Sequence, residues 1–256
     1  MKLSVLIVLI LGGSWSWAQN ETPDLTDSVL FCNGGAIPVY IPGIDSTGSY
    51  ELFHENGTLK AKGKITRKQR HGLWTSFYRN GEKRSEGLMN MGSPYGVWTF
   101  YYDNGKVKAK GIIDNGKFEL GCAGSGNFMK VLIRVGSWSF YTDDGSVILS
   151  CHFIKNKSKE EVLGGVYTSY FTNGKKKESG QYKLGQKFGH WTYYHNSGVK
   201  KREEFYLYKD CGLYDYNWYE CPSGTWMYYD ENGDPFKKQI YSEGLMQEEV
   251  MLKPNR

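Results

Sequence analysis

What this 256-residue sequence lacks already limits its fold. After the first twenty residues, no segment places apolar residues at a sustained helical spacing, which argues against a helical protein. The apolar run Leu3–Leu11 is too short to span a bilayer as a stable anchor, and no other stretch is long enough to cross a membrane as a helix. Proline is scarce, with 7 residues against 32 glycines, and the glycines recur at fixed distances from aromatic residues. This combination is typical of strands and turns rather than of disorder.

The motifs of common catalytic and cofactor sites are also missing. The sequence has no Gly-x-Ser-x-Gly elbow, no His-Glu-x-x-His, no phosphate-binding loop and no dinucleotide fingerprint. Carboxylates are scattered, and no Cys-x-x-Cys pair offers metal ligands. The histidines do not cluster, and four lie beside turns or links: His54, His71, His190 and His195. We therefore expect no enzyme, no cofactor and no metal site.

The formal net charge of +5 is mild. It is compatible with weak attraction to an anionic surface, but it does not indicate a nucleic-acid-binding protein.

The N-terminus has the pattern of an export signal. Met1-Lys2 gives a positive start, Leu3–Leu11 is apolar, and Ser16-Trp17-Ala18 forms a small-x-small cleavage site before Gln19. The alternative to an export signal is that this apolar segment forms an N-terminal strand of the fold. Because no cysteine directly follows the site, we expect an exported protein of the bacterial periplasm or exterior that is not a lipoprotein.

Export would place the five cysteines in an oxidising compartment. Cys211 and Cys221 flank an insertion and are the most natural disulfide pair. Cys122 and Cys151 are a possible second pair, which would leave Cys32 over. Sequence alone does not fix the pairing.

One phrase, Gly-x-aromatic-x-x-aromatic-x-x-x-Gly, occurs seven times and organises the chain. Its clearest copy is Gly96–Gly105. The first aromatic position, which we call the key position, is held by Tyr50, Trp74, Trp98, Trp138, Tyr167, Trp191 and Trp226. The second, three residues later, is held by Phe53, Phe77, Tyr101, Tyr141, Tyr170, Tyr194 and Tyr229.

Each copy predicts one β-hairpin. Aromatic and β-branched residues suit a half-buried strand, and the Asn-Gly that ends most copies favours a two-residue type I′ turn. A polar second strand and a glycine-rich link follow. Since an isolated hairpin is marginal in water, neighbouring hairpins must pair. The expected fold is all-β, an elongated single antiparallel sheet of tandem hairpins.

The repeat register divides the chain into four parts. Residues 1–18 are the signal segment, 19–46 a cap, 47–247 the seven repeats and 248–256 a polar tail. Longer intervals between key positions predict insertions near residues 117–134, 152–164 and 205–223. Pro235 predicts an edge strand, because proline cannot donate to a sheet ladder.

The phrase Gly96–Gly105, with links such as Gly185–Gly189, resembles the MORN repeat and most of all the bacterial MORN-variant, antitoxin-like group. The likeness covers about residues 48–247. It implies an elongated, twisted sheet used for protein contacts, scaffolding or association with lipid. Cys151 and Glu204 depart from it, because they replace the glycine that Gly63, Gly87, Gly111 and Gly180 supply thirteen residues after the key position.

Three sets of residues are candidates for binding. We expect the aromatic residues at the key position and three residues later to form the core, whereas the fourth residue is more variable and leaves Tyr78 and Tyr102 as exposed contacts. A basic column follows the turns: Lys60, Arg84, Lys108, Lys177 and Lys201. It is either a solvated face or a stripe for an anionic partner.

The third set lies in the insertion between Cys211 and Cys221. Tyr214, Tyr216 and Trp218 either make contacts with a partner or fold back over the sheet. The leading hypothesis is an exported protein-interaction or scaffold module whose partner is another protein. The alternatives are an antitoxin- or immunity-like protein, and a binder of envelope polysaccharide or an anionic lipid surface.

Overall fold

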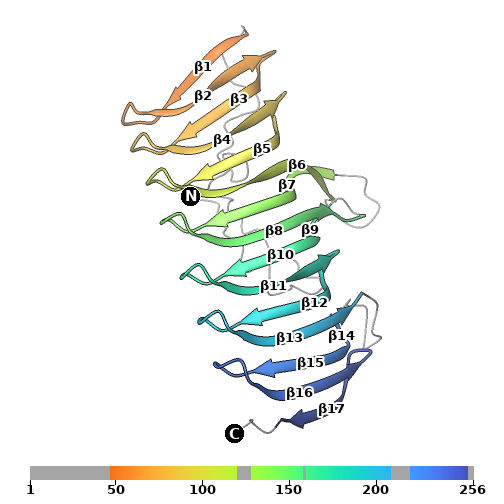
Figure 1. Ribbon diagram of the computed structural model, residues 1–256. Coiled ribbons are helices and arrows are strands. Elements are labelled where there is room, and N and C mark those ends of the chain that lie inside the picture. Colours follow the sequence, from red (N-terminus) through yellow and green to blue (C-terminus); the bar gives the residue numbers. More distant parts are fainter. Residues whose placement is uncertain (1–46, 120–127, 158–159, 209–219, 253–256) are drawn as a thin grey trace, which may run out of the picture.

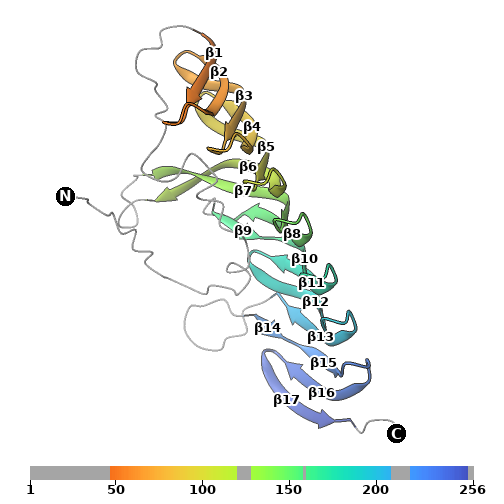
Figure 2. The same cartoon turned by 90° about the vertical axis from the view of Figure 1, so that its left-hand side faces the viewer.

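The computed structural model describes residues 47–119, 128–157, 160–208 and 220–252. These residues form one open antiparallel sheet of consecutive hairpins, which runs from β1 at one end to β17 at the other (Figure 1). Seen from the side, the strands make a single layer (Figure 2). The all-β fold predicted from the repeat, an elongated sheet of tandem hairpins, is confirmed.

The described sheet contains seventeen strands. Their bounds are β1 Gly48–Phe53, β2 Leu59–Thr66, β3 Gln69–Phe77, β4 Lys83–Asn90, β5 Ser93–Tyr101, β6 Val107–Glu119, β7 Phe128–Tyr141, β8 Val147–Lys155, β9 Glu161–Leu163, β10 Gly165–Tyr170, β11 Lys176–Lys183, β12 Gln186–Tyr194, β13 Lys200–Leu207, β14 Cys221–Pro222, β15 Gly224–Tyr229, β16 Pro235–Ser242 and β17 Leu245–Met251. Both β9 and β10 pair with β8, and both β14 and β15 pair with β13.

The turn inside each hairpin is a three-residue loop. In the first hairpin, His54 N donates to Thr58 O at 2.8 Å, and Gly57 N donates to His54 O at 2.9 Å. Gly57 has a φ of 81°, whereas Asn56 is not among the residues with positive φ. This is a type I turn followed by a left-handed glycine, so the prediction of type I′ turns at Asn-Gly is wrong.

Type I′ geometry occurs instead in the links between hairpins. Both central residues have positive φ in the pairs Arg67-Lys68, Met91-Gly92, Leu184-Gly185 and Glu243-Gly244. The residues on either side of each pair face one another across the ladder, as Asn90 and Ser93 do. The two ends of the strands therefore turn in different ways.

The core depends on a close contact between a tryptophan and a glycine on the preceding strand. A Cβ atom added to Gly87 would lie 2.2 Å from the ring of Trp98. The same geometry recurs for Gly63 with Trp74, Gly111 with Trp138 and Gly180 with Trp191. The indole nitrogen of Trp74, Trp138 and Trp191 also donates to the carbonyl one residue beyond that glycine. Where the indole takes this position, a Cβ on the facing residue would overlap the ring, which explains the glycine at these four positions. The hairpin after Glu204 also has a tryptophan, Trp226, whose indole nitrogen donates to Phe205 O at 3.3 Å, so a larger residue is accommodated there.

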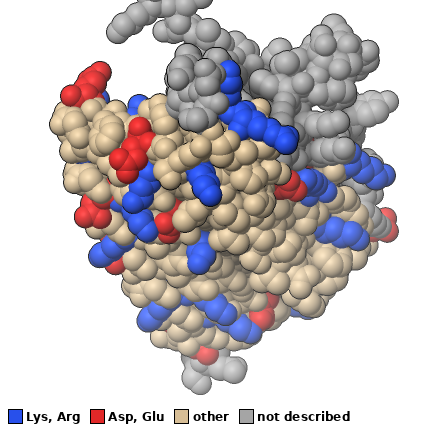
Figure 3. Space-filling view, turned by 90° about the horizontal axis from the view of Figure 1, so that it is seen from above, with Lys and Arg blue, Asp and Glu red and all other residues tan. Residues whose placement is uncertain are grey.

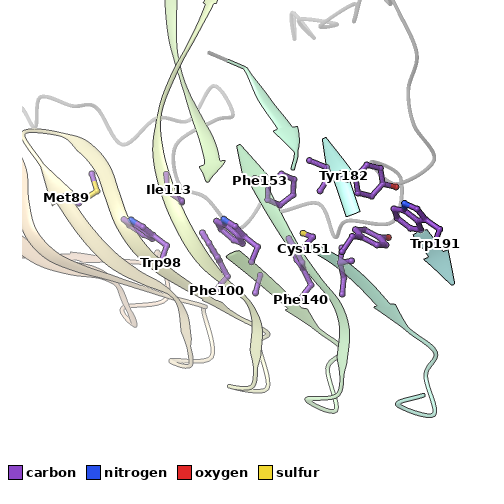
Figure 4. Close-up of a cluster of buried hydrophobic side chains, with 14 of the residues drawn as sticks. Met89, Trp98, Phe100, Ile113, Phe140, Cys151, Phe153, Tyr182 and Trp191 are labelled. Carbon is purple, nitrogen blue, oxygen red and sulfur yellow. The ribbon is translucent and has the colours of Figure 1, made fainter. Parts of the chain in front are cut away.

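The rings continue along one face of the sheet, which we call the inner face. The centroids of Trp98 and Phe100, of Phe100 and Trp138, and of Trp138 and Phe140 lie 6.2, 6.2 and 5.8 Å apart (Figure 4). The partner of the key aromatic is therefore the residue two positions later, which side-chain alternation places on the same face.

The residue three positions after the key position lies on the opposite, outer face. Phe53 is 57% exposed, and Tyr101 and its equivalents are half-buried and outside the core cluster. The prediction of burial is therefore correct for six key aromatics, while the seventh, Tyr50, is half-buried against the core, and it is wrong for the aromatic residues that follow them by three.

Three hairpins have a larger residue in place of the core glycine: Cys151, Glu204 or Gln239. Cys151 is buried and forms no disulfide, so the possible Cys122–Cys151 pair is not formed. Its burial raises the pKa of its thiol to about 12. The key aromatic of the next hairpin is Tyr167 rather than tryptophan, and it is 1% exposed. A smaller ring thus accompanies a larger residue on the facing strand.

The predicted insertions differ in what they form. The longest strands, β6 and β7, carry the chain into the segment near residues 117–134, and β8 and β9 occupy most of residues 152–164. Strand β17 includes residues 248–251, which belong to the predicted tail. Pro235 begins β16, which pairs with β15 and β17. The prediction of an edge strand there is wrong, because a proline at the first position of a strand disturbs little of its ladder.

Residues 1–46, with the predicted signal segment and cap, lie outside the described residues. Within the described ranges, no helix is long and apolar enough to cross a membrane.

We predict that Gly87→Ala lowers the free energy of unfolding by about 1–3 kcal/mol, because the new methyl group overpacks the Trp98 ring. Chemical denaturation measures the change. The control is Gly48→Ala, since a Cβ at Gly48 has no atom within 4 Å. Equal stability of the two variants would contradict the contact.

Candidate functional site

The predicted tyrosine and basic columns meet at the hairpin turns. Arg84 lies over the ring of Tyr78, and Lys108 lies over the ring of Tyr102, each 5.7 Å from the ring centroid. Both tyrosines are half-buried. Their hydroxyls donate to the backbone of the next hairpin, Tyr78 to Tyr101 O at 2.7 Å and Tyr102 to Tyr141 O at 2.8 Å. These tyrosines therefore brace neighbouring hairpins, and contact with a partner through them stays a prediction.

Asparagine side chains add a second brace along the turns. Asn80 Nδ2 donates to Asp103 O at 2.7 Å, and Asn104 Nδ2 donates to Asp143 O at 2.8 Å. Asn80 Oδ1 also accepts from Glu82 N, two residues on. The turn edge is thus a ladder of polar contacts between hairpins, which leaves its asparagines engaged within the sheet.

The rest of the basic column is spread along the array. Lys60 and Lys177 are half-buried, and Lys201 is exposed. Seen from the β1 end, positive side chains are separated by neutral and acidic ones (Figure 3). An anionic ligand for this column therefore stays a prediction.

Four of the predicted residues fall outside the described part of the chain: Cys211, Tyr214, Tyr216 and Trp218. Cys221 is fully buried in β14 and takes part in a disulfide. Its pairing with Cys211, and a contact role for the aromatic insertion, stay predictions.

A polar cluster replaces the apolar core towards the C-terminal end of the inner face. Glu204, which stands where other hairpins have glycine, is 4% exposed. Its Oε1 lies 2.7 Å from Arg202 Nε, and its Oε2 accepts from the Tyr206 hydroxyl at 2.8 Å. In the next hairpin, Gln239 Oε1 accepts from the Tyr228 hydroxyl at 2.6 Å. Buried hydrogen bonds therefore form within each of the last two hairpins, and the rings of Tyr206 and Trp226, with centroids 5.4 Å apart, make the contact between them.

Lys187 extends this cluster. Its Nζ donates to the Tyr193 hydroxyl at 2.9 Å and lies 3.7 Å from Glu220 Oε2. It is also 5.1 Å from the ring centroid of Trp191 and 5.5 Å from that of Tyr206. Aromatic faces attract a cation held over them. The rings therefore stabilise the positive charge of Lys187, although neighbouring side chains cover most of it. Among the described residues, no group of three His, Cys, Asp or Glu side chains is placed to hold a metal ion.

The outer face carries a strip of exposed apolar side chains that the sequence analysis missed. We define the outer strip as Leu73, Leu88, Tyr95, Val97 and Ile112, which are 60%, 39%, 40%, 52% and 38% exposed. The sequence does contain a sign of it. Leu73 and Val97 immediately precede a key tryptophan, and Leu88 and Ile112 follow one by fourteen residues, so alternation places all four away from the inner face.

Four segments match the family model described as MORN repeat variant: residues 46–64, 70–90, 94–115 and 163–184. The chain therefore contains MORN repeat variants. The matched units are those whose second strand has Gly63, Gly87, Gly111 or Gly180. The hairpins with Cys151, Glu204 or Gln239 lie outside the matched segments, so the polar cluster coincides with a departure from the repeat.

Comparison with curated proteins finds no match. Among solved structures, this chain is similar to the one described as "Crystal Structure of TcdB2-TccC3-Cdc42", with a TM-score of 0.18 and 10% identity. That similarity covers 80% of this chain and 12% of the other chain. A TM-score this low carries no argument about fold or function.

We predict that several tyrosines ionise late because the folded sheet favours their neutral form. Burial, followed by a hydrogen bond to Glu86, raises the pKa of Tyr101 to about 12, and burial raises that of Tyr228 to about 12. Because these folded-state pKa values exceed the unfolded value, their stabilisation is complete below pH ~10 and is lost as the pH rises towards 12.

Absorbance at 295 nm follows the ionisation of the tyrosines, and near-ultraviolet circular dichroism of the same samples follows the loss of the folded structure. We expect late tyrosine ionisation to coincide with loss of the folded signal, and all tyrosines to titrate together in denaturant. Ionisation of every tyrosine in one step near pH ~10 by a folded protein would contradict the prediction.

Proposed function

We propose that this chain is a repeat-based binding module that holds a partner protein on its outer strip. The presence of MORN repeat variants supports a binding module in general. The observation that carries the protein partner is the outer strip itself, because contiguous exposed apolar side chains on a soluble surface mark contact sites.

The strip is contiguous because its members face one another across the strands. Leu73 is opposite Leu88, Leu88 is opposite Tyr95, and Val97 is opposite Ile112. Tyr95 lies on the outer face because it is opposite Leu88, and Val97 lies there because it is the neighbour of Trp98, which faces inward. The strip thus crosses four adjacent strands, β3 to β6.

Burial of these side chains would supply affinity. Covering the exposed part of each one contributes on the order of 1 kcal/mol, and several together offset the entropy lost on association. A polar rim lies beside them on the outer face. Glu86 accepts from the Tyr101 hydroxyl at 2.5 Å and lies 2.9 Å from Lys83 Nζ. An apolar centre with a charged rim is the usual arrangement of a protein contact.

Other roles predict different partners. An immunity-like protein would hold a toxin on the same strip and neutralise it. A binder of envelope polysaccharide or anionic lipid would use the basic column, and salt would weaken its binding. No observation in the described part of the chain favours either role over the protein contact.

We predict that replacing Leu73 and Val97 together with lysine abolishes capture of the partner in a pull-down from an extract of the organism that encodes the chain. Lysine keeps the β3 and β5 backbones unchanged but places charge in the centre of the strip. The matched control is Val166→Lys, since Val166 also precedes a key aromatic and is 64% exposed, but it lies outside the strip.

Loss of one stoichiometric protein with the double variant alone would support the proposal. A partner retained by the double variant, or lost equally with Val166→Lys, would overturn it. Retention on anionic polymer that salt abolishes, with no captured protein, would also overturn it. Rescue of a toxin-expressing cell by the wild type but not by the double variant would identify the partner as a toxin.

A further inference from the structure

Strand β17 leaves one side of its backbone open. It pairs with β16, and no strand pairs with its other side in the part of the chain that the structure describes. Leu252 N donates to Phe236 O at 2.8 Å, so the backbone of Leu252 faces β16. Backbone groups alternate in direction along an antiparallel strand, and the N–H and C=O of Met251 therefore point away from the sheet.

This edge lacks several of the features that protect an edge strand, and what it does have is two glutamates and a register shift between Met246 and Glu248. Six of its seven residues are exposed, among them Leu245, Met246 and Met251 at 53%, 55% and 65%. It carries no proline and no lysine, the residues that most often discourage strand addition. Its charged residues are Glu248 and Glu249, which are both exposed and, as neighbours in a strand, point to opposite faces. Lys237 Nζ on β16 lies 3.6 Å from Glu249 Oε2, and Gln239 Nε2 donates to the same oxygen, so Glu248 is the carboxylate that a basic partner would meet first.

The sheet itself indicates what kind of strand fits beside β17. A link with two positive φ values precedes β17, as one precedes β12, so β17 occupies the position of a first strand in a hairpin. In most hairpins of this array the strand that follows a first strand is basic: β2 carries Lys60, Lys62 and Lys64, β6 begins with Val107-Lys108-Ala109-Lys110, and β13 begins with Lys200-Lys201-Arg202. The exception is β8, which has a lysine only at its last residue, Lys155. A basic strand would also meet the two carboxylates of β17.

A second copy of this chain fits less well. The open edge at the other end of the array is β1, which carries Glu51. End-to-end pairing of β17 with β1 would bring carboxylates of both edges together. Two copies of β17, paired antiparallel about Glu248 or Glu249, would place glutamates opposite one another. Like charges directly opposite destabilise a strand pair.

We infer that the open edge of β17 binds an extended, lysine-rich segment of a partner protein by strand addition. Backbone hydrogen bonds to Met251 and the other outward groups supply the pairing, and Glu248 and Glu249 select a basic sequence. This surface is separate from the outer strip on β3 to β6, and the inference does not depend on that strip.

The test uses a fluorescent peptide with the sequence of Leu59–Thr66, Leu-Lys-Ala-Lys-Gly-Lys-Ile-Thr, and a second peptide in which each lysine is glutamate. Fluorescence anisotropy measures binding of each peptide to the full chain. We expect the lysine peptide to bind at least about tenfold more tightly than the glutamate peptide. Equal binding of the two peptides, or no binding of either, would overturn the inference.

Two variants locate the binding. Met251→Pro removes an outward N–H that β16 does not use, whereas Met251→Ala removes the side chain and keeps the N–H. We expect Met251→Pro to weaken lysine-peptide binding at least about tenfold and Met251→Ala to change it less than about twofold. Equal binding by both variants would overturn the inference, and near-ultraviolet circular dichroism verifies that each is folded.

Two further measurements separate the alternatives. We expect the double variant Leu73→Lys, Val97→Lys to bind the lysine peptide as the wild type does, because the edge of β17 is separate from the outer strip. This result is expected whether or not the outer strip binds a partner protein. Sedimentation of the unliganded chain detects self-association. A dimer that Met251→Pro abolishes would identify a second copy as the occupant of the edge and overturn the basic partner.

Discussion

The sheet depends on the contact between a tryptophan ring and a glycine on the strand before it. At Gly63, Gly87, Gly111 and Gly180, an added Cβ would lie 2.1–2.4 Å from the facing ring. The ring therefore occupies the space of the missing side chain, and the indole N–H of Trp74, Trp138 and Trp191 reaches a backbone carbonyl beyond it. In this way a single-layer sheet obtains a buried core within the layer, where most sheets need a second layer. Each hairpin is then stable only beside its neighbour.

The departures from this contact change the character of the core. Tyr167 accompanies Cys151, so a smaller ring follows a larger residue. Glu204 and Gln239 bring polar groups into the inner face, where Arg202, Tyr206 and Tyr228 provide their partners. The hairpins with these residues lie outside the segments that match the MORN repeat variant model. The core is therefore purely aromatic and apolar near β5, whereas near β16 buried hydrogen bonds accompany the rings.

The repeat made much of this predictable. Spacing located the hairpins and the buried tryptophans, because a fixed aromatic–glycine pattern has one simple structural meaning. The turn type was not predictable from Asn-Gly, since that pair also fits a type I turn with a left-handed glycine. Tyr101 and its equivalents lie on the face opposite the tryptophans, and an aromatic residue at a repeated position does not by itself show whether its face is covered. Tyr78 and Arg84 were found in separate columns, and only the fold brings them together. The outer strip and the β17 edge depend on register across strands, which a single sequence does not reveal.

The most direct measurement of the central contact is a double-mutant cycle at the hairpin that departs from it. Tyr167→Trp alone would force an indole against Cys151, and Cys151→Gly alone would leave the smaller ring without its neighbour. Together they restore the pair found at Gly87 and Trp98. We predict that the double variant is at least about 1 kcal/mol more stable in chemical denaturation than the sum of the single changes. Additive effects within about 0.5 kcal/mol would contradict the claim that ring and glycine fit one another across the strands.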